Sequence, residues 1–138
     1  MSIRITDSLG SVDGGALKRF YADSDFDNGR TADEHERSFR NSVVRLAFDG
    51  DLLVGAARAI TDDVKTAAVF DVCVLPAYRG RGIARQLMTS LTEGLRGQFI
   101  LLTCNPSLER LYSKVGFGPL RPDDTAMASP DDLRHRRA

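Results

Sequence analysis

A basic turn with two glycines is the part of the sequence that most clearly predicts chemistry. Gly80 and Gly82 stand two residues apart, between an apolar run and an amphipathic run that begins at Ile83. Glycines at such a turn let successive backbone N–H groups point inward, and a helix start adds partial positive charge. Together these features form a cradle for the oxygens of a pyrophosphate. Arg79 and Arg81 could add positive charge outside that cradle.

Other phosphate-binding motifs fit this turn poorly. No G-K-S/T follows the glycines, so the turn is not a P-loop, and Arg85 stands where a dinucleotide-binding fold needs its third glycine. A turn with solvated arginines is the competing interpretation of an isolated R-G-x-G. The apolar strand before the turn, its stop at Pro76 and the amphipathic helix after it favour the phosphate cradle.

A lone carboxylate, Asp71, interrupts the apolar run that leads to this turn. A carboxylate in such a strand needs a partner or a wet cavity, so Asp71 could be a base, an anchor for an ammonium group or a loop cap. Arg58, on the preceding strand, could point inward to pair with Asp71 or bind an acidic acceptor, or it could lie on a solvated face.

The two cysteines, Cys73 and Cys104, do not form a C-x-x-C pair, and histidine is scarce, so we expect no metal site. A nucleophilic cysteine needs a nearby base, but His35 and His135 lie in a predicted helix and in the tail. Both cysteines are therefore expected to be inert.

The elements that position these residues follow from hydrophobic periodicity and turn residues. Helices are predicted over 14–22, 31–41, 83–96 and 106–115, and strands over 3–6, 42–48, 52–60, 66–75 and 98–103, with a short edge strand over 125–129. This order predicts a mixed α/β layered domain, in which 67–103 forms a right-handed βαβ crossover with parallel strands.

Length and charge limit the classes of function. The 138 residues suffice for one domain, which we place at 1–129, followed by a charged tail at 130–138. With 19 basic and 19 acidic residues, broad nucleic-acid binding is not expected, and the basic group at 134–137 is too small to change this. No apolar run is long enough for a membrane span, and residues 1–10 resemble no secretory signal, so we expect a cytoplasmic protein.

Two motifs in sequence order resemble one family, the GCN5-related N-acetyltransferases (GNAT). Its acetyl-CoA signature reads Q/R-x-x-G-x-G/A, and Arg79, Gly82 and Ala84 fill its fixed positions after the strand 72–76. Downstream, Asn105, then Tyr112 seven residues on, then Gly116-Phe117 match the family pattern N…FYxxxGF. The resemblance covers about 54–120.

This resemblance implies how acetyl-CoA would be held. The fold would be a single, mostly antiparallel sheet with helices on both faces and one parallel crossover. The loop's backbone amides would bind the pyrophosphate, and pantetheine would lie where the strands ending at Leu75 and Thr103 splay apart. Asn105 would hydrogen-bond the pantetheine arm, although Asn also serves as a helix N-cap. The residues expected to bind the donor are Val72, Val74, Arg79, Gly80, Arg81, Gly82, Ile83, Ala84 and Asn105.

The resemblance also assigns catalytic candidates. Tyr112 aligns with the tyrosine that protonates the leaving thiolate, although a tyrosine here could also be a core residue. Many members use a strand Glu as general base, but this sequence has no Glu between Val43 and Met88. Asp71 is the one carboxylate inside that strand, and base and structural roles both stay open for it. Acetyl transfer is expected by direct attack of an amine in a ternary complex.

The acceptor site is expected from Phe20 to Phe39 and from Pro119 to Ser129. The acidic, aromatic segment 21–27 could attract a cationic amine or be a solvated loop. The expected acceptor is a primary amine of small or medium size, with a protein amine also open. A homodimer is compatible with the family. The competing function is a non-catalytic module of the same fold that senses acetyl-CoA or binds a partner.

Overall fold

The computed structural model describes residues 2–129. The strands are β1 (Ile3–Thr6), β2 (Val43–Asp49), β3 (Leu52–Thr61), β4 (Thr66–Val74) and β5 (Phe99–Leu101). The α-helices are α1 (Gly14–Asp23), α2 (Ala32–Arg40), α3 (Ile83–Gly94) and α4 (Glu109–Ser113), and short 3-10 turns cover Pro76–Tyr78 and Pro106–Leu108.

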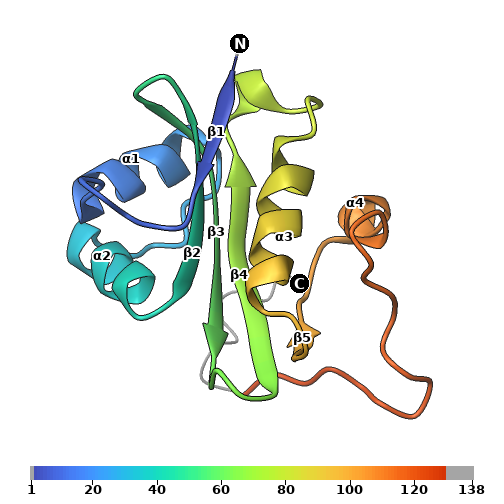
Figure 1. Ribbon diagram of the computed structural model, residues 1–138. Helices are drawn as coiled ribbons and strands as arrows, with labels where there is room; N and C mark the ends of the chain where they lie inside the picture. The colour runs from blue at the N-terminus through green and yellow to red at the C-terminus, as the bar shows by residue number, and fades with distance from the viewer. Residues whose placement is uncertain (1, 130–138) are drawn as a thin grey trace.

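The strands form one sheet in the order β1-β2-β3-β4-β5 (Figure 1). The first four strands pair antiparallel, and β4 pairs parallel with β5. The β4–α3–β5 unit is the crossover that the sequence predicts. It matters for function because it places the start of α3 at the end of β4.

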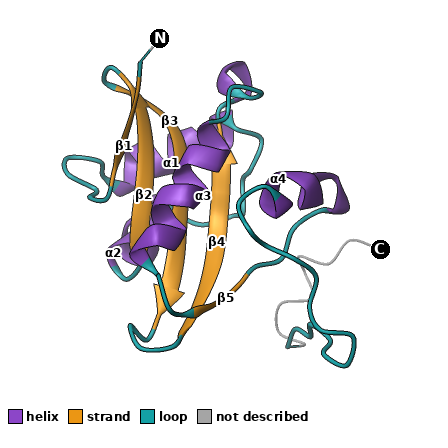
Figure 2. Cartoon of the chain, turned by 45° about the vertical axis from the view of Figure 1, so that its right-hand side comes forward, coloured by secondary structure: helices purple, strands orange, loops and turns teal. Residues whose placement is uncertain are grey.

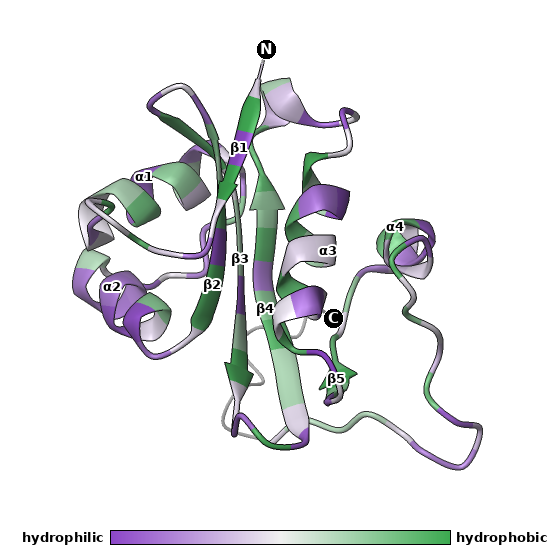
Figure 3. Ribbon diagram, in the orientation of Figure 1, coloured by the Kyte–Doolittle hydropathy of each residue, from purple (hydrophilic) through white to green (hydrophobic). Residues whose placement is uncertain are grey.

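Helices cover both faces of the sheet (Figures 1 and 2). The helices α1 and α2 lie on one face, where Leu17, Tyr21 and Phe39 pack on inward residues of β2 and β3. On the other face, α3 packs through Leu87 and Leu91 in a second core. Figure 3 shows β3 and β4 largely green with purple interruptions, which reflects buried strands that each carry polar residues.

Local sequence explains where α1 and α2 begin. The Asp13 carboxylate accepts a hydrogen bond from the Ala16 N–H and caps α1. Thr31 and Glu34 form the predicted capping box at the start of α2, because each side chain accepts from the other residue's N–H. Between the two helices lies the loop 24–31, which reaches toward β4.

The helix α3 makes a close contact with the sheet. Gly55 lies on β3 beneath α3, and a Cβ placed there would come within 2.9 Å of Leu87 Cδ1 and 3.3 Å of Ile83 Cγ2. Leu87 Cδ1 is the end of a flexible side chain, so a methyl group at position 55 would first require the side chains of α3 to move. Without a side chain, Gly55 lets Leu87 and Ile83 of α3 pack closely on β3.

Several boundaries differ from the sequence prediction. The helix α3 ends at Gly94 and β5 spans only Phe99–Leu101, since chain ends of this kind carry little periodic signal. The helix expected over 106–115 divides into a 3-10 turn and the short α4. The strand expected over 125–129 is wrong, because these residues have no regular structure. The predicted tail, 130–138, lies outside the described residues. Among the described residues, no helix has the length and apolar character that a membrane crossing requires.

Candidate active site

A β-bulge at Asp71 interrupts the pairing of β3 with β4. Ala56 pairs with Cys73 and Arg58 pairs with Phe70, so two residues of β4 face the single residue between them on β3. Asp71 has a φ of +60°, a left-handed conformation that is uncommon for residues other than glycine. Such a conformation costs on the order of 1–3 kcal/mol and persists only where the surroundings hold it.

Three donors hold Asp71 in this conformation. Arg30 Nη1 and Arg58 Nε both donate to Asp71 Oδ2, at 2.6 Å and 2.7 Å. The Tyr21 hydroxyl donates to the Asp71 carbonyl at 2.6 Å, and burial, then the nearby Asp71 charge, raise the pKa of this phenol well above its ordinary value. The Asp71 side chain is only 9% exposed. The two-sided ion pair therefore locks the bulge to β3 and to the loop 24–31.

The bulge precedes a stretch of β4 that has no partner strand in the described residues on its outer edge. The pairing with β5 covers only Thr66, Ala67 and Ala68. The Leu75 N–H donates to the Val54 carbonyl of β3 at 2.9 Å. Because consecutive N–H groups of an extended chain point to opposite edges, the N–H of Val74 points toward the open edge. The family resemblance predicts that the pantetheine arm would lie along this open edge, beside Val74.

The glycine turn follows directly from this open edge. Gly80 and Gly82 have φ values of +79° and +80°, and Gly82 is the N-cap of α3. A Cβ added at either position would meet nothing within 4 Å. These glycines are therefore required by the backbone conformation and not by crowding. The open space in front of them is where a bound pyrophosphate would lie at the start of α3.

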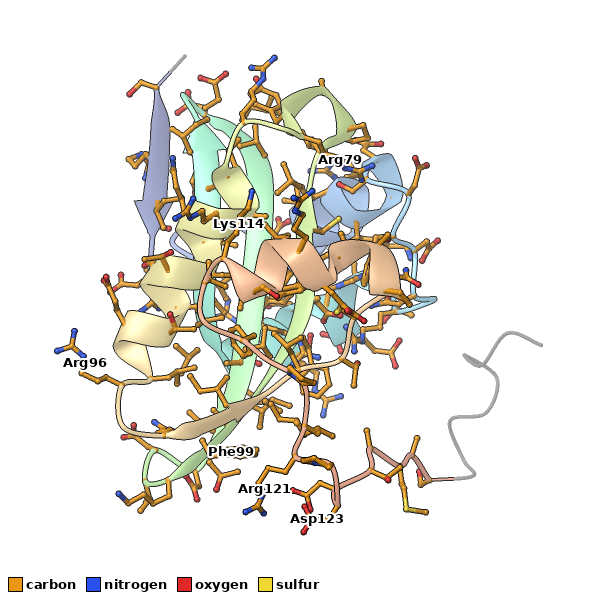
Figure 4. All side chains as sticks on the ribbon, turned by 90° about the vertical axis from the view of Figure 1, so that its right-hand side faces the viewer. Arg79, Arg96, Phe99, Lys114, Arg121 and Asp123 are labelled. Atoms are coloured by element: carbon orange, nitrogen blue, oxygen red, sulfur yellow. The ribbon has the colours of Figure 1, made fainter. Side chains whose placement is uncertain are left out.

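Side chains of the turn tie it to two other parts of the fold. Arg79 Nε donates to the Val74 carbonyl at 3.0 Å, and Arg79 Nη2 donates to the Ser24 carbonyl at 2.8 Å. In Figure 4, Arg79 accordingly lies beside the blue ribbon of α1. The Tyr78 hydroxyl donates to Asp49 Oδ2 at 2.6 Å, at the end of β2. Arg79 thus braces the loop from within, whereas Arg81 lies over the Tyr78 ring at 5.2 Å.

Tyr112 lies on α4, across the open edge from these elements. Its ring is 7% exposed and meets Phe117 edge to face at 6.2 Å. Burial, with smaller contributions from Cys104 and Cys73, raises the pKa of Tyr112 to about 12. The phenol is therefore fully protonated at neutral pH, as a proton donor must be. Tyr112 packs in the core and also lies near the open edge of β4. Its two interpretations from the sequence, as a core residue and as a proton donor, are therefore compatible.

Asn105 and the cysteines also lie near the splay. Asn105 precedes the 3-10 turn but makes no capping hydrogen bond with its side chain, which is exposed. Both cysteines are free thiols, Cys73 buried and Cys104 exposed, and burial raises the pKa of the Cys73 thiol. Arg58 is buried, so the inward alternative holds. In the described part of the chain no three His, Cys, Asp or Glu residues gather as a metal site.

A groove of about 930 Å³ opens between β5, the end of α3, α4 and the segment 115–124. Cys104 and Tyr112 line it on one side and Leu120 on another. Phe99, 62% exposed, and Arg121 also line the groove and lie near each other in Figure 4. Residues 79–84 are not among those that line it, so the groove is separate from the glycine turn.

Comparison with known proteins decides the family. The sequence model of the Acetyltransferase (GNAT) family matches residues 13–117. This range includes the strands β2 to β5, the helix α3 and Tyr112. The chain belongs to the GNAT acetyltransferase family. Of the helices and strands of this GNAT chain, only β1 among the described residues lies outside the matched range.

Relatives and solved structures agree with this assignment. The GNAT chain is 33% identical over 114 residues to serotonin N-acetyltransferase 2, chloroplastic, of Oryza sativa subsp. japonica, covering 77% of this chain and 56% of the relative. The chain spans about half the length of the curated relatives it matches.

Two solved structures show the same fold. An acetyltransferase of the GNAT family from Streptococcus pneumoniae TIGR4 has a TM-score of 0.76 and 26% identity, covering 93% of this chain and 96% of that one. A probable acetyltransferase of unknown function from meticillin-resistant Staphylococcus aureus has a TM-score of 0.80 at 20% identity, covering 93% and 98%. The mixed sheet with its parallel β4–β5 pair is therefore a GNAT fold.

Sequence reasoning missed two members of the Asp71 cluster, Arg30 and Tyr21. Arg30 lies in an irregular loop 41 residues from Asp71, where no periodicity predicts a side-chain contact. The sequence places Tyr21 on the apolar face of a helix and in the acidic, aromatic segment 21–27 of the expected acceptor site, but predicts no contact with Asp71. Its hydroxyl could have been suspected, because a buried phenol needs a partner, but no pattern names the Asp71 carbonyl.

Proposed function

We propose that this GNAT protein transfers the acetyl group of acetyl-CoA to a primary amine of a small or medium acceptor, by direct attack in a ternary complex. The observation that carries the proposal is the alignment of three features along β4. The open edge begins after Ala68, the glycine turn follows at its end, and Tyr112 packs in the same core cluster as Val74 and Ile83 on either side of that turn.

The donor would be held mostly by backbone groups. Amides at Arg81, Gly82, Ile83 and Ala84 would face the pyrophosphate at the start of α3. The N–H of Val74, with that of Val72 on the same edge, would pair with the pantetheine amides. Asn105, whose side chain makes no cap, would hydrogen-bond the same arm. Gly80 supplies the second left-handed conformation of the turn, and Arg79 braces it.

The reaction needs few groups beyond correct placement. The lone pair of the neutral amine attacks the thioester carbonyl carbon, the carbon–sulfur bond breaks, and the sulfur takes the proton of the Tyr112 hydroxyl. One proton leaves the amine nitrogen and restores the phenol, so the products are the acetamide and free coenzyme A. Holding both substrates together supplies a large share of the acceleration.

For Asp71 the geometry favours a positioning role over that of a base. Both guanidinium groups donate to the same oxygen, Oδ2, and the Tyr21 hydroxyl holds the carbonyl of the same residue. A carboxylate that stabilises two arginines and a strained backbone has a structural task already. We therefore assign Asp71 the role of holding the bulge. In this mechanism the acceptor amine loses its proton without help from the Asp71 carboxylate.

Donor binding is the first test. Acetyl-CoA, coenzyme A and NADPH are compared by isothermal titration calorimetry on wild type, Gly82→Trp and Gly10→Trp. Gly10 is a matched control, because its φ is also positive and its Cβ position is also open. Micromolar acetyl-CoA binding, about 8 kcal/mol, should be lost only in Gly82→Trp. Wild type that binds no coenzyme A species would contradict the proposal.

Catalysis is the second test, read as release of coenzyme A thiol with a panel of amines. Tyr112→Phe should lower kcat by about 100-fold, the lower end for loss of a general acid, and leave the acetyl-CoA affinity unchanged. An equal kcat in Tyr112→Phe would remove this residue from the mechanism. Tight acetyl-CoA binding without thiol release from any amine would instead support a non-catalytic, acetyl-CoA-sensing module.

A further inference from the structure

We propose that Arg30 recognises an anionic group on the acceptor, so that the acceptor is a small amine that also carries a carboxylate or phosphate. This proposal rests on the proposed acetyltransferase function and names the substrate class of the same site. It follows from one asymmetry in the Asp71 cluster, from the positive charge and the buried Asn28 donor near Arg30, and from the link between this cluster and Tyr112 through β4.

The asymmetry lies between the two arginines that share Asp71 Oδ2. The Arg58 side chain is 6% exposed, donates also to Ser42 Oγ at 3.1 Å and lies over the Phe70 ring at 5.3 Å. The Arg30 side chain is 32% exposed. One guanidinium is thus a structural group, and the other presents part of its planar fork to solvent, where it can bind a carboxylate or phosphate.

Positive charge and a buried hydrogen-bond donor lie near Arg30. Two arginines share the single carboxylate of Asp71, and Lys18 Nζ donates to the Arg30 carbonyl at 2.7 Å. Asn28 Nδ2 is a buried donor with no acceptor in residues 2–129, while its Oδ1 accepts from the Arg30 N–H at 3.1 Å. Asn28 Nδ2 is thus a buried donor close in sequence to Arg30, and a ligand that supplies an oxygen acceptor could satisfy it.

Two other carboxylates close in sequence to Arg30, those of Glu34 and Asp27, are engaged in local turns. Glu34 Oε1 accepts the Thr31 N–H at 2.9 Å as part of the capping box. Asp27 Oδ1 accepts the Gly29 N–H at 2.9 Å. Both groups are exposed to water and therefore offset the charge of Arg30 only weakly.

The position of Arg30 suits a small acceptor. Arg30 pairs with Asp71 on β4. Tyr112 packs in the same core cluster as Val74, three residues further along this strand. Arg30 and the candidate acid are therefore linked through one short stretch of β4, so one small molecule could present its amine near Tyr112 and its anionic group to Arg30.

Apolar surface lies next to the same cluster. Phe26 in the loop 24–31 and Phe70 on β4 are 39% and 43% exposed. Phe26 also contacts Tyr21, whose hydroxyl reaches Asp71. These rings offer packing for the carbon body of the acceptor, so Arg30 would supply selectivity for the anionic group on that body.

The test uses pairs of amines that differ only in the anionic group. Phenylalanine is compared with phenethylamine, and glucosamine 6-phosphate with glucosamine, so that the carboxylate and phosphate sources are separated. The kcat/KM of the anionic member should exceed that of its neutral partner at least tenfold in one pair. Because the readout is a ratio within one protein, a general loss of stability or activity does not change it.

Three variants link this ratio to Arg30. Arg30→Gln should bring the ratio close to one, and Arg30→Lys should keep part of it, because charge remains while the planar fork is lost. Arg40→Gln is the matched control and should keep the full ratio, because Arg40 is 64% exposed and pairs with Glu36 on α2. Equal kcat/KM within both pairs, or a ratio that survives Arg30→Gln, would overturn the proposal.

The failures of this proposal and of the proposed function are distinguishable. The same amine pairs are titrated by calorimetry into protein saturated with coenzyme A, which requires no turnover. If acetyl-CoA does not bind at all, the acetyltransferase function fails. If acetyl-CoA binds but the anionic amines bind no better than the neutral ones, only the role of Arg30 fails.

Discussion

The two sides of the site are built in different ways. The donor side, which we define as residues 79–84 with the open edge of β4, depends on backbone conformation, with left-handed glycines and a strand edge that β5 does not cover beyond Ala68. The acceptor side, which we define as the loop 24–31 with Asp71 and Arg58, depends on side chains that meet from distant parts of the chain. A backbone cradle suits a ligand that stays the same, whereas side-chain contacts suit one that differs between relatives.

The difference also concerns stability. The conformation of the donor side is local to one turn, in which Gly80 and Gly82 have positive φ values. The acceptor side concentrates two ion pairs on one nearly buried carboxylate at a strained position. Changes on the acceptor side should therefore alter the folding free energy most, and changes on the donor side should mainly alter ligand affinity.

The largest expected effect is that of Asp71→Asn. Asn tolerates the positive φ, so the change removes charge but not the backbone conformation. It leaves the buried Arg58 without its anion, which should lower the free energy of unfolding by about 3–5 kcal/mol in urea titrations. Adding Arg58→Met should recover part of that loss. A cost below about 1 kcal/mol would show that the ion pairs do not hold the bulge.

The stability of the protein at alkaline pH tests the raised pKa of Tyr112, the buried tyrosine on α4. The folded-state pKa of Tyr112, about 12, lies above the ordinary tyrosine pKa of about 10. Its contribution to stability is therefore complete below pH 10 and is lost as pH rises toward 12, by about 2–3 kcal/mol in total. Tyr112→Phe should lose less stability than wild type over this window in thermal melts. Tyr21, whose pKa is also raised, is unchanged in both proteins.

Arg79 connects the two sides, so its removal tests whether they are independent. Arg79→Met deletes the charged hydrogen bonds to the Val74 and Ser24 carbonyls and should cost about 1.5–3 kcal/mol of stability. We expect it to raise both the acetyl-CoA Kd and the acceptor KM. Arg85→Met, on the exposed face of α3, is the control. A change confined to acetyl-CoA would show that Arg79 serves the donor side alone.

The smallest expected effect separates the cost of a side chain at positive φ from the cost of a side chain in the donor-binding turn. Gly82→Ala and Gly10→Ala both place a Cβ at positive φ in open space, and each should cost about 1 kcal/mol of stability. Only Gly82→Ala should weaken acetyl-CoA binding, by about fivefold in calorimetry. Equal acetyl-CoA affinities in the two variants would mean that the turn does not contact the donor.

Sequence patterns predicted the donor side well because its determinants are local. The two glycines, the stop at Pro76 and the apolar face of α3 lie within one short segment, and the observed β4–α3–β5 crossover has the predicted order. The family resemblance at these positions is confirmed by the match over 13–117. The roles assigned to individual residues of the turn stay predictions.

The acceptor side was predicted only in part because its contacts join residues far apart in sequence. The Arg58–Asp71 pair was one of several options, and the bulge that turns both residues toward α1 cannot be derived from alternation along a strand. Arg30 carries no pattern at all. The strand expected over 125–129 failed for a related reason, since a few polar and small residues do not specify a partner strand.

The bare backbone at Gly55 lets the side chains of Leu87 and Ile83 on α3 pack directly against β3. Because Gly82 is the N-cap of α3, any shift of this helix also moves the turn at its start. A methyl group at position 55 would crowd Leu87 and Ile83, and whatever part of that crowding the side chains did not absorb would be passed to the helix and the turn. Evolution or a protein engineer could use this position to tune donor affinity without altering any residue of the turn itself.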